Sequence, residues 1–408
     1  MAIDGDEGSL RRAWASIGSE SGLTLDAVEL WLVDAGFARP VRTARGEHRS
    51  RPLVLVQLHG HAGGSPVQGW GECAALADAT YDDEDAPSAV ATLERWLVPA
   101  LMAEAARAGA RVPKPSDLAP VRQAGPGAPL AFAALEMAVA DAHLRAEGRS
   151  LARVLGVEGR PVPIGAVIGQ FGSAGSLVAE AARLAGEGFT RVKIKIGPGW
   201  DFEAMEAVTR EIPTLRVQAD ANGSYTSSDI GYLTGIDRFG LLCLEQPFDR
   251  DDLDSHRRLA GLMTTPVCLD ESIDSAGAAR RALAMGACSV VCIKPARLGG
   301  LGAALDLVQS CTDAAVPLWM GGMFEAGYAR GVNATLAALP GFAWPGDLSP
   351  PGSYLEVDPA PGDAPARSGP GGALCVRPPA GGGLGTAPDL RILEQRCVER
   401  RRIEADGR

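Results

Sequence analysis

Short apolar runs rich in Val, Ile and Leu alternate with amphipathic stretches in the part of the chain beyond residue 160. The amphipathic stretches, such as SLVAEAARLAGEG and SAGAARRALAMGA, repeat apolar residues at the three- and four-residue spacing that is typical of helices. Strands that alternate with helices through short loops predict a parallel sheet, and seven such units favour a closed barrel over an open sheet. The seven apolar runs span residues 163–169, 191–196, 215–220, 241–246, 266–271, 289–295 and 316–322.

The part of the chain before residue 150 has a mixed pattern that predicts an α+β domain. Residues 23–33 and 52–60 are typical of strands, whereas 85–102 and 130–148 have helical spacing, the latter ending at a glycine. The first residues are polar and predict a loose extension. We therefore expect an extension over residues 1–23, an α+β domain over 24–150, the barrel over 151–350 and a C-terminal segment over 351–408.

The C-terminal segment divides into two parts by composition. Residues 356–385 are rich in Pro and Gly, which predicts turns and at least one mobile loop. Residues 389–408 predict a closing helix with a polar end.

Composition and net charge limit the kinds of molecule that we expect the protein to bind. The chain has 46% hydrophobic and 22% charged residues, as ordinary globular proteins do, and a formal net charge of −11. That charge argues against a nucleic acid or an anionic membrane as partner, but it leaves an anionic small substrate open. The eight cysteines form no C-x-x-C pair, and neither a bilayer-spanning run nor a signal-peptide pattern is present, so we expect a cytoplasmic protein with reduced thiols.

Five of the apolar runs carry a charged residue at or next to their last positions. These five residues recur at a regular spacing. The intervals between these residues are 25, 25, 25 and 24 positions, about one strand–helix unit each. Because the carboxyl ends of all barrel strands meet at one mouth, we expect the five side chains to converge there. They are Lys195, Asp220, Glu245, Asp270 and Lys294.

Three carboxylates held close together repel one another unless a cation lies between them. Asp and Glu oxygens suit a hard divalent ion, so Asp220, Glu245 and Asp270 predict a Mg²⁺ site, which Mn²⁺ could also occupy. Zinc is disfavoured because no histidine stands at a strand end. The alternative is that these are separate loop acids or helix N-caps, and their regular period argues against it.

One further lysine, Lys193, bears on the chemistry of this mouth. Lys193 and Lys195 alternate with apolar residues, so both face the same side of their strand. A neighbouring cation lowers the pKa of a lysine, which would let Lys195 act as a general base with Lys193 as the neighbour that tunes it. An exposed edge strand, or a simple salt bridge for Lys294, is the alternative reading. This set of groups suits removal of a proton next to a carboxylate, with metal offsetting the enediolate charge.

The ordered motifs resemble the enolase superfamily, in its muconate-lactonizing-enzyme-like subgroup. They are KIK at 193–195, DAN at 220–222, EQP at 245–247, DES at 270–272 and KP at 294–295. The resemblance is closer still to the branch of o-succinylbenzoate synthases and N-succinylamino acid racemases. The segments that carry it are 40–46, 69–81, 198–201, 293–300, 321–342 and 345–347.

The resemblance implies a (β/α)₇β TIM-like barrel with an α+β capping domain to which the C-terminal tail returns. It implies that Asp220, Glu245 and Asp270 bind Mg²⁺, that Lys195 is the base on one face of the substrate, and that Lys294 stands on the other face. It also implies that a capping loop at 36–51 closes over the substrate. The residues it assigns to substrate binding or tuning are Thr43, Asn222, Arg297, Gly322, Met323 and Glu325.

The function that the resemblance implies is dehydration of 2-succinyl-6-hydroxy-2,4-cyclohexadiene-1-carboxylate in menaquinone synthesis. The alternatives are N-succinylamino acid racemisation, alone or beside the dehydration, and a non-catalytic metal-binding barrel. A small-molecule carboxylate is the expected partner, and a homo-oligomer remains open. Val41, Arg45, Tyr328 and the 356–370 insertion depart from the family pattern, and they concern the choice of substrate rather than the chemistry.

Overall fold

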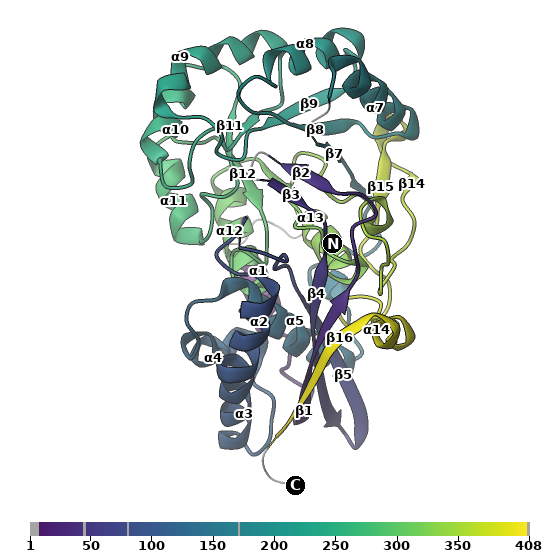
Figure 1. Ribbon diagram of the computed structural model, residues 1–408. Coiled ribbons are helices and arrows are strands. Elements are labelled where there is room, and N and C mark those ends of the chain that lie inside the picture. Colours follow the sequence, from purple (N-terminus) through teal and green to yellow (C-terminus); the bar gives the residue numbers. More distant parts are fainter. Residues whose placement is uncertain (1–7, 44–45, 80, 170–171, 406–408) are drawn as a thin grey trace.

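The computed structural model describes residues 8–43, 46–79, 81–169 and 172–405. Figure 1 shows a barrel of parallel strands in the upper part of the molecule and an antiparallel sheet with its helices in the lower part. The last strand of the chain, drawn in yellow, belongs to the lower part. This arrangement confirms the predicted barrel with an α+β capping domain.

The barrel sheet contains seven parallel strands that follow one another in chain order. Each strand lies inside one of the seven predicted apolar runs, because a strand buried on both faces needs an almost continuous apolar sequence. The strands are β7 (Ala166–Ile168), β8 (Arg191–Lys195), β9 (Arg216–Asp220), β10 (Leu244–Glu245), β11 (Val267–Leu269), β12 (Val290–Ile293) and β13 (Leu318–Met320).

An irregular eighth segment closes the barrel between its first and last strands. Residue Phe342 bridges to Leu318 of β13, and the backbone N–H of Asp347 donates to Met320 O at 2.8 Å. On the other side, Gly165 N donates to Gly346 O at 2.8 Å. Residues 342–347 therefore supply the last strand of the (β/α)₇β barrel.

Helices follow the seven strands and cover the outside of the barrel (Figure 1). Side-chain caps begin several of them: Ser173, Asp201, Asp252 and Ser275 each accept a hydrogen bond from a backbone N–H of the first turn. No helix among the described residues is long and apolar enough to cross a membrane. The helices are α7 (Ala174–Glu187), α8 (Phe202–Glu211), α9 (Ile230–Leu233), α10 (Leu253–Ala260), α11 (Ala276–Ala284), α12 (Leu301–Asp313) and α13 (Gly327–Ala337), with 3₁₀ turns η3 (Ser227–Asp229) and η4 (Thr234–Phe239) beside α9.

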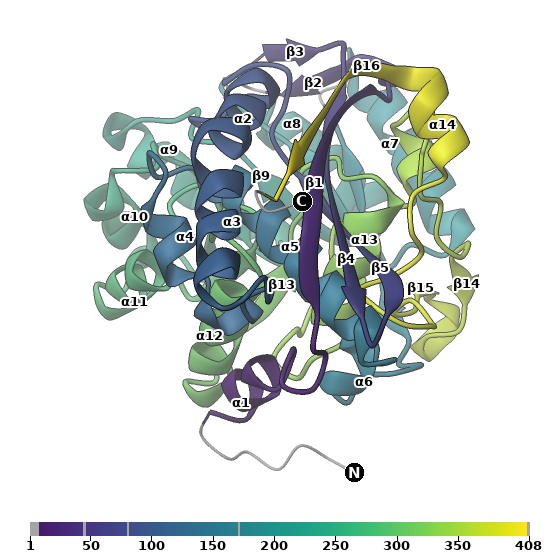
Figure 2. The same cartoon turned by 90° about the horizontal axis from the view of Figure 1, so that it is seen from below.

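The capping domain is an antiparallel sheet packed against helices (Figure 2). Its long helix α5 (Pro129–Ala146) is buried along most of its length because it lies between the sheet and the barrel. Gly71 of the sheet allows this close approach, since a Cβ there would lie 1.8 Å from Ala134 O. The sheet order is β16 (Cys397–Glu404), β1 (Thr24–Asp34), β4 (Pro52–Ala62) and β5 (Ser65–Cys73). The other elements are β2 (Val41–Thr43), β3 (Gly46–His48), α2 (Ala86–Thr92), η1 (Leu93–Leu97), α3 (Val98–Arg107), η2 (Pro115–Asp117), α4 (Ala119–Gln123) and α6 (Leu151–Val154).

The end of the chain corrects one sequence expectation. Residues 389–408 were expected to form a closing helix. In the described part of this range, which ends at residue 405, only α14 (Leu390–Arg396) is helical, and β16 pairs antiparallel with β1. The reason is a period of two in the charged residues. Arg400 and Arg402 both reach the buried Glu29, whereas Arg401 faces the opposite side and pairs with Glu94.

The N-terminal extension also differs from expectation within the described residues. Ser9–Ala15 form α1, which packs on α12 and buries Leu10 and Trp14. Arg11 pairs with Asp306 of α12 at 2.9 Å. Residues 8–23 are thus a docked segment rather than a loose one, because apolar side chains at helical spacing give them a face to bury.

The Pro- and Gly-rich segment after the barrel folds back on its outer side. Strand β15 (Leu374–Val376) pairs with β14 (Ala366–Arg367) and with β6 (Val162–Pro163), and Leu374 N donates to Gly188 O at 2.9 Å. The short 3₁₀ turns η5 (Pro351–Ser353) and η6 (Pro370–Gly372) complete it.

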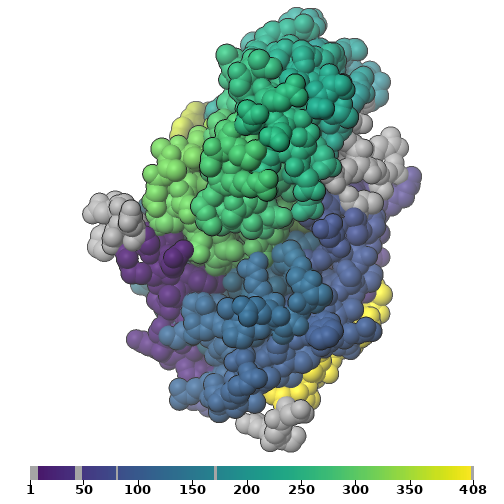
Figure 3. All heavy atoms as spheres, turned by 90° about the vertical axis from the view of Figure 1, so that its left-hand side faces the viewer, coloured from purple at the N-terminus to yellow at the C-terminus, as the bar shows by residue number. Residues whose placement is uncertain are grey.

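Two buried glutamates join the capping domain to barrel helices, and Figure 3 shows the two parts in direct contact. Glu72 of β5 accepts hydrogen bonds from Ala326 N at 2.7 Å and Ala329 N at 3.1 Å, at the start of α13. Glu136 of α5 accepts from Leu301 N and Gly302 N at the start of α12. The first N–H groups of a helix have no partner within the helix, and its N-terminal end carries partial positive charge, so both helix starts suit these acidic side chains.

Glu136 predicts a pH dependence of stability. Burial raises its pKa to about 8, against about 4.3 for an unfolded glutamate. Between these values the folded state binds a proton that the unfolded state does not, so the free energy of unfolding falls as pH rises, by up to about 1.4 kcal/mol per pH unit. We expect denaturant unfolding of Glu136→Gln to show a flatter slope between pH 5 and 8 than the wild type. The exposed Glu158→Gln is the matched control and should keep the wild-type slope; equal slopes in all three proteins would contradict the prediction.

Candidate active site

The five charged residues at the strand ends converge at one mouth of the barrel. Asp220 is the register partner of Lys195 on one side and of Glu245 on the other, and Asp270 and Lys294 directly follow β11 and β12. Lys195 Nζ lies 2.6 Å from Asp220 Oδ2, and Lys294 Nζ lies 2.7 Å from Asp270 Oδ2. The structure therefore places the two lysines on opposite sides of a row of buried carboxylates.

Lys193 lies deeper in the barrel than Lys195, on the same face of β8. Its Nζ is 2.7 Å from Asp347 Oδ2, 3.2 Å from Asp220 Oδ2 and 3.3 Å from Glu245 Oε2, and it sits 4.7 Å from the ring centre of Trp319. The apolar partners of the strand, Val192 and Ile194, are fully buried in the opposite direction. The alternation read from the sequence thus separates a charged interior from an apolar outer layer.

The charges at the mouth shift several pKa values in the described residues. Burial, followed by the neighbouring carboxylates of Asp220 and Asp270, raises the pKa of Glu245 well above its usual range. Burial alone would also raise the pKa of Asp270, but Lys294 and Arg297 hold it well below its usual range. Among the three predicted metal ligands, Glu245 is therefore the one whose pKa lies above its usual range.

Neighbouring carboxylates raise the pKa of two lysines at the mouth. Burial would lower the pKa of Lys193, but Asp347, Glu245 and the nearby Asp220 outweigh it and raise the pKa well above the usual range. For Lys294, burial is likewise outweighed, chiefly by Asp270. The lowered pKa that the sequence predicts for a lysine beside a bound cation stays a prediction.

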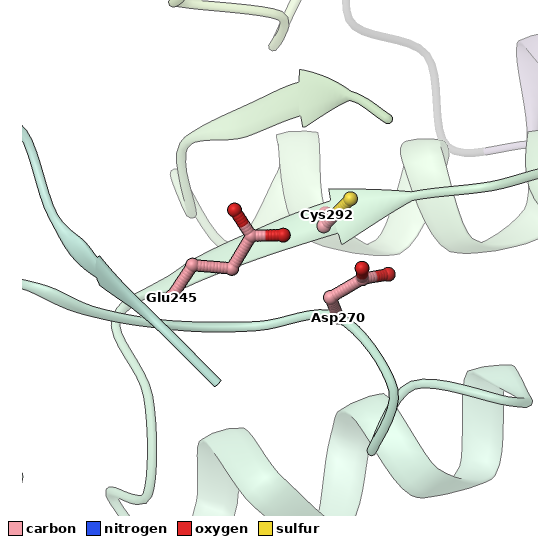
Figure 4. Close-up of side chains that lie close together, drawn as sticks. All are labelled: Glu245, Asp270 and Cys292. Carbon is pink, nitrogen blue, oxygen red and sulfur yellow. The ribbon is translucent and has the colours of Figure 1, made fainter. Parts of the chain in front are cut away.

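The carboxylates have the composition of a divalent-cation site. Figure 4 shows Glu245 and Asp270 with their carboxylates turned toward one another and the thiol of Cys292 beside them. One ligand atom from each of these three residues lies within 4.8 Å of the others, and all three are buried. Asp220, fully buried one strand away, supplies the third carboxylate of the predicted set. Three buried carboxylates with a raised pKa at the central one fit a hard divalent cation.

Tyr81 of the capping domain joins this site, and sequence reasoning did not select it. Its hydroxyl accepts a hydrogen bond from Lys294 Nζ at 2.6 Å and donates to Asp270 Oδ2 at 3.0 Å. Burial and Asp270 raise its pKa well above the usual range, so the phenol keeps the proton that it donates. The sequence signal that could have identified Tyr81 is its position as the last residue of segment 69–81, which carries the family resemblance.

Asp347 is the second residue that the sequence reasoning missed. It is the last residue of the irregular eighth segment, where no apolar run marks a strand end. Arg191 Nη1 lies 2.6 Å from its carboxylate and Lys193 Nζ 2.7 Å. Burial would raise the pKa of Asp347, but these two cations hold it well below its usual range. Asp347 anchors the deep end of the charged row.

A cavity of about 790 Å³ opens above the row, and Lys193, Lys195 and Lys294 line it. Most remaining lining residues are apolar or come from the capping domain and the C-terminal segment. Those that bear on the sequence predictions are Arg39, Val41 and His48 of the 36–51 loop, Gly322 and Met323 after β13, and Pro365 of the 356–370 insertion.

Of the remaining predicted site residues, those that the structure describes do not line this cavity. Asn222 contacts Lys195, whose Nζ donates to Asn222 Oδ1 at 2.8 Å. Arg297 pairs with Asp270 and with Asp82 and does not line the cavity. Glu325 pairs with Arg330 at 2.8 Å and also lies outside the lining. Thr43 belongs to β2, but its side chain, like all of Arg45, lies outside the described residues.

Tyr328, a departure from the family pattern, has a structural position. It is buried in α13, and its hydroxyl donates to Trp70 O of the capping sheet at 2.6 Å. It does not line the cavity. The residue therefore joins the two domains, and of the departures that the structure describes, Val41 and Pro365 of the insertion line the cavity.

Comparison with known proteins gives two family matches. The family described as "Enolase C-terminal domain-like" matches residues 176–392, and the family "Mandelate racemase / muconate lactonizing enzyme, N-terminal domain" matches residues 27–156. An N-succinylamino acid racemase of Amycolatopsis is 38% identical over 374 residues, which cover 91% of this chain and 97% of that protein. An o-succinylbenzoate synthase of Geobacillus kaustophilus is 36% identical, covering 87% and 91%.

Solved structures agree with these matches. A member of the enolase superfamily from Listeria innocua superposes with a TM-score of 0.85 at 30% identity, over 94% of this chain and 100% of that one. A muconate lactonizing enzyme of Pseudomonas fluorescens, at 23% identity and a TM-score of 0.81, covers 92% and 100% and shares the fold. The chain is therefore an enzyme of the enolase superfamily and belongs to the mandelate racemase / muconate lactonizing enzyme family.

Proposed function

We propose that the protein is an o-succinylbenzoate synthase that dehydrates 2-succinyl-6-hydroxy-2,4-cyclohexadiene-1-carboxylate in menaquinone synthesis. The observation that carries the proposal is that Lys195 and Lys294 line one cavity from β8 and β12, on either side of three buried carboxylates. The similarity to o-succinylbenzoate synthases over most of the chain supports the same substrate. Free thiols at all eight cysteines support a reducing, cytoplasmic location for the reaction.

The metal proposed for the site is Mg²⁺, held by Asp220, Glu245 and Asp270; Mn²⁺ suits the same oxygen ligands. When bound, it supplies positive charge that offsets the negative charge developing on the substrate carboxylate. The substrate is a small-molecule carboxylate that enters the cavity between the two lysines.

The chain's own residues then carry the protons. Lys195 Nζ removes the α-proton and returns it to the leaving hydroxyl on the same face, so that one water is lost and the ring becomes aromatic. Asp220 and Asn222 hold Nζ during this transfer, at 2.6 and 2.8 Å. The Lys294 ammonium, held by Asp270 and Tyr81, stabilises the enediolate charge from the opposite face.

The second candidate function is racemisation of N-succinylamino acids. The observation that favours it is that each lysine has its own pair of hydrogen-bonding partners, so that either could give or take a proton. In that reaction Lys195 and Lys294 exchange the roles of acid and base. The similarity to the racemase of Amycolatopsis supports this alternative.

A direct assay tests the proposal. Purified protein with Mg²⁺ is offered the cyclohexadiene substrate and, separately, N-succinyl amino acids of both hands. We expect loss of the diene absorbance together with formation of o-succinylbenzoate. Brisk racemisation without dehydration would replace the first proposal by the second, and no turnover of either substrate would reject both.

A further inference from the structure

Glu271 is a buried acid beside the active site to which the proposed chemistry gives no role. Its side chain is 2% exposed and follows Asp270 at the end of β11. Its Oε1 accepts a hydrogen bond from Asn222 Nδ2 at 2.9 Å, and its Oε2 has no hydrogen-bond partner within the described residues. A buried carboxylate with one oxygen unpaired is costly, so the contact that it does make needs an explanation.

The contact fixes which way the Asn222 amide points. The amide group donates through Nδ2 to Glu271 and accepts through Oδ1 from Lys195 Nζ at 2.8 Å. Turning the amide over would set its NH₂ against an amine or ammonium and its oxygen against a carboxylate, which loses both hydrogen bonds. The backbone is fixed as well, because Asn222 has a φ of 44° and its N–H donates to Asp220 Oδ1 at 3.1 Å. Asn222 can therefore present only its oxygen to Lys195.

This orientation bears on the direction of the Lys195 lone pair. A neutral lysine amine has two N–H bonds and one lone pair. Asp220 Oδ2 at 2.6 Å and Asn222 Oδ1 at 2.8 Å provide two acceptors for the two N–H bonds. With both acceptors in place, the lone pair is left facing the cavity that Lys195 lines.

We propose that Glu271 is a positioning residue that orients Lys195 through Asn222. The role rests on the proposed two-lysine chemistry and adds to it a residue that touches neither substrate nor the lysine. Lys294 serves as an internal comparison, because hydrogen bonds to Asp270 and Tyr81 hold its Nζ, whereas its interaction with Glu271 is one of charges through space. Loss of Glu271 should therefore impair proton transfer at one lysine and spare the other.

The test is Glu271→Leu, which keeps the approximate shape of the side chain but removes the acceptor of Asn222 Nδ2. It is assayed by deuterium exchange of N-succinyl amino acids in D₂O. One enantiomer loses its α-proton to Lys195 and the other to Lys294; the enantiomer that still exchanges in Lys294→Arg is the one served by Lys195. We expect Glu271→Leu to slow exchange of that enantiomer about tenfold or more, and exchange of the other less than about twofold. The kcat of dehydration should fall by a similar factor with KM unchanged, and the exposed Glu158→Gln should match the wild type.

A second variant keeps the test informative if Glu271→Leu folds poorly. Asn222→Ala should produce the same enantiomer-selective loss, and adding Glu271→Leu to it should change the exchange rate little further, since both act through one contact. Equal loss for both enantiomers, or no loss, would overturn the positioning role. A wild type that neither exchanges nor dehydrates any of these substrates would instead overturn the proposed function, and the role of Glu271 with it.

Discussion

Replacing Lys195 with Ala will lower kcat for dehydration, and for any racemisation, by about 10³–10⁴-fold, because the variant lacks the group that removes the α-proton. No neighbour can take over this task. Lys193 points to Asp347 and Glu245 deeper in the barrel, and Lys294 acts from the other side of the carboxylate row. Steady-state kinetics with saturating Mg²⁺ will measure the loss.

The control for this prediction is the neighbouring lysine. In Lys195→Ala, Asp220 keeps Lys193 at 3.2 Å, so we expect a thermal midpoint close to that of the wild type. Lys193→Ala should behave differently. Removing a buried cation from three carboxylates costs about 3–5 kcal/mol of stability, which a lowered thermal midpoint will report. Turnover retained in Lys195→Ala, or similar stability in both variants, would contradict the separation of a catalytic lysine from a structural one.

The sequence predicts the parts of the fold in which a local pattern and the tertiary structure agree. The barrel strands are recognisable because their burial on both faces demands apolar runs, and the charged residues at their ends converge because parallel strands share a mouth. Strand β16 was mistaken for a helix because helical and strand patterns are hard to separate in a charged segment. The alternation of its charged residues indicates a strand only when it is known that Glu29 of β1 pairs with both Arg400 and Arg402.

The residues missed in the site share a different cause. Tyr81 reaches Lys294 from another domain, 213 positions away in the chain, and no local pattern reports such a contact. Asp347 ends a strand that is too irregular to be recognised from apolar residues. Glu271 is the middle residue of the 270–272 motif, whose first residue, Asp270, is the predicted ligand, and its contact with Asn222 depends on the backbone of the segments that follow β11 and β9. The sequence therefore predicts which types of residue form the site, but not which distant segments contact one another there.

The hydrogen bonds of Tyr81 give the capping domain a part in the active site beyond covering the substrate. A capping loop that closes over substrate would leave the catalytic groups complete in the barrel. Here the capping domain supplies a hydroxyl within hydrogen-bond distance of both Lys294 and Asp270. Glu72 and Glu136 hold the same domain against the first turns of α13 and α12. The capping domain is thus part of the charged site as well as part of the cavity wall.

Removal of divalent metal will abolish turnover, and Mg²⁺ will raise the thermal midpoint of the metal-free protein. The carboxylates of Asp220, Glu245 and Asp270 are buried side by side, and their mutual repulsion and burial raise the pKa of Glu245. A cation that binds only the folded state stabilises it by about 2.7 kcal/mol at a hundredfold excess over its Kd. Treatment with EDTA followed by Mg²⁺ titration, read by thermal unfolding and by activity, will measure both effects.

Two matched variants decide which side chains hold the ion. Glu245→Gln keeps the shape of the central residue but removes its charge, so the Mg²⁺-dependent rise in thermal midpoint should disappear together with activity. Cys292→Ser alters the third member of the Glu245–Asp270–Cys292 group, yet it should retain the full Mg²⁺ response, because Mg²⁺ selects oxygen and a thiolate suits softer ions. Loss of the response in Cys292→Ser alone would place the ion on sulfur and contradict the three-carboxylate site. An unchanged response in Glu245→Gln would exclude the central carboxylate as a ligand, whatever the activity of that variant.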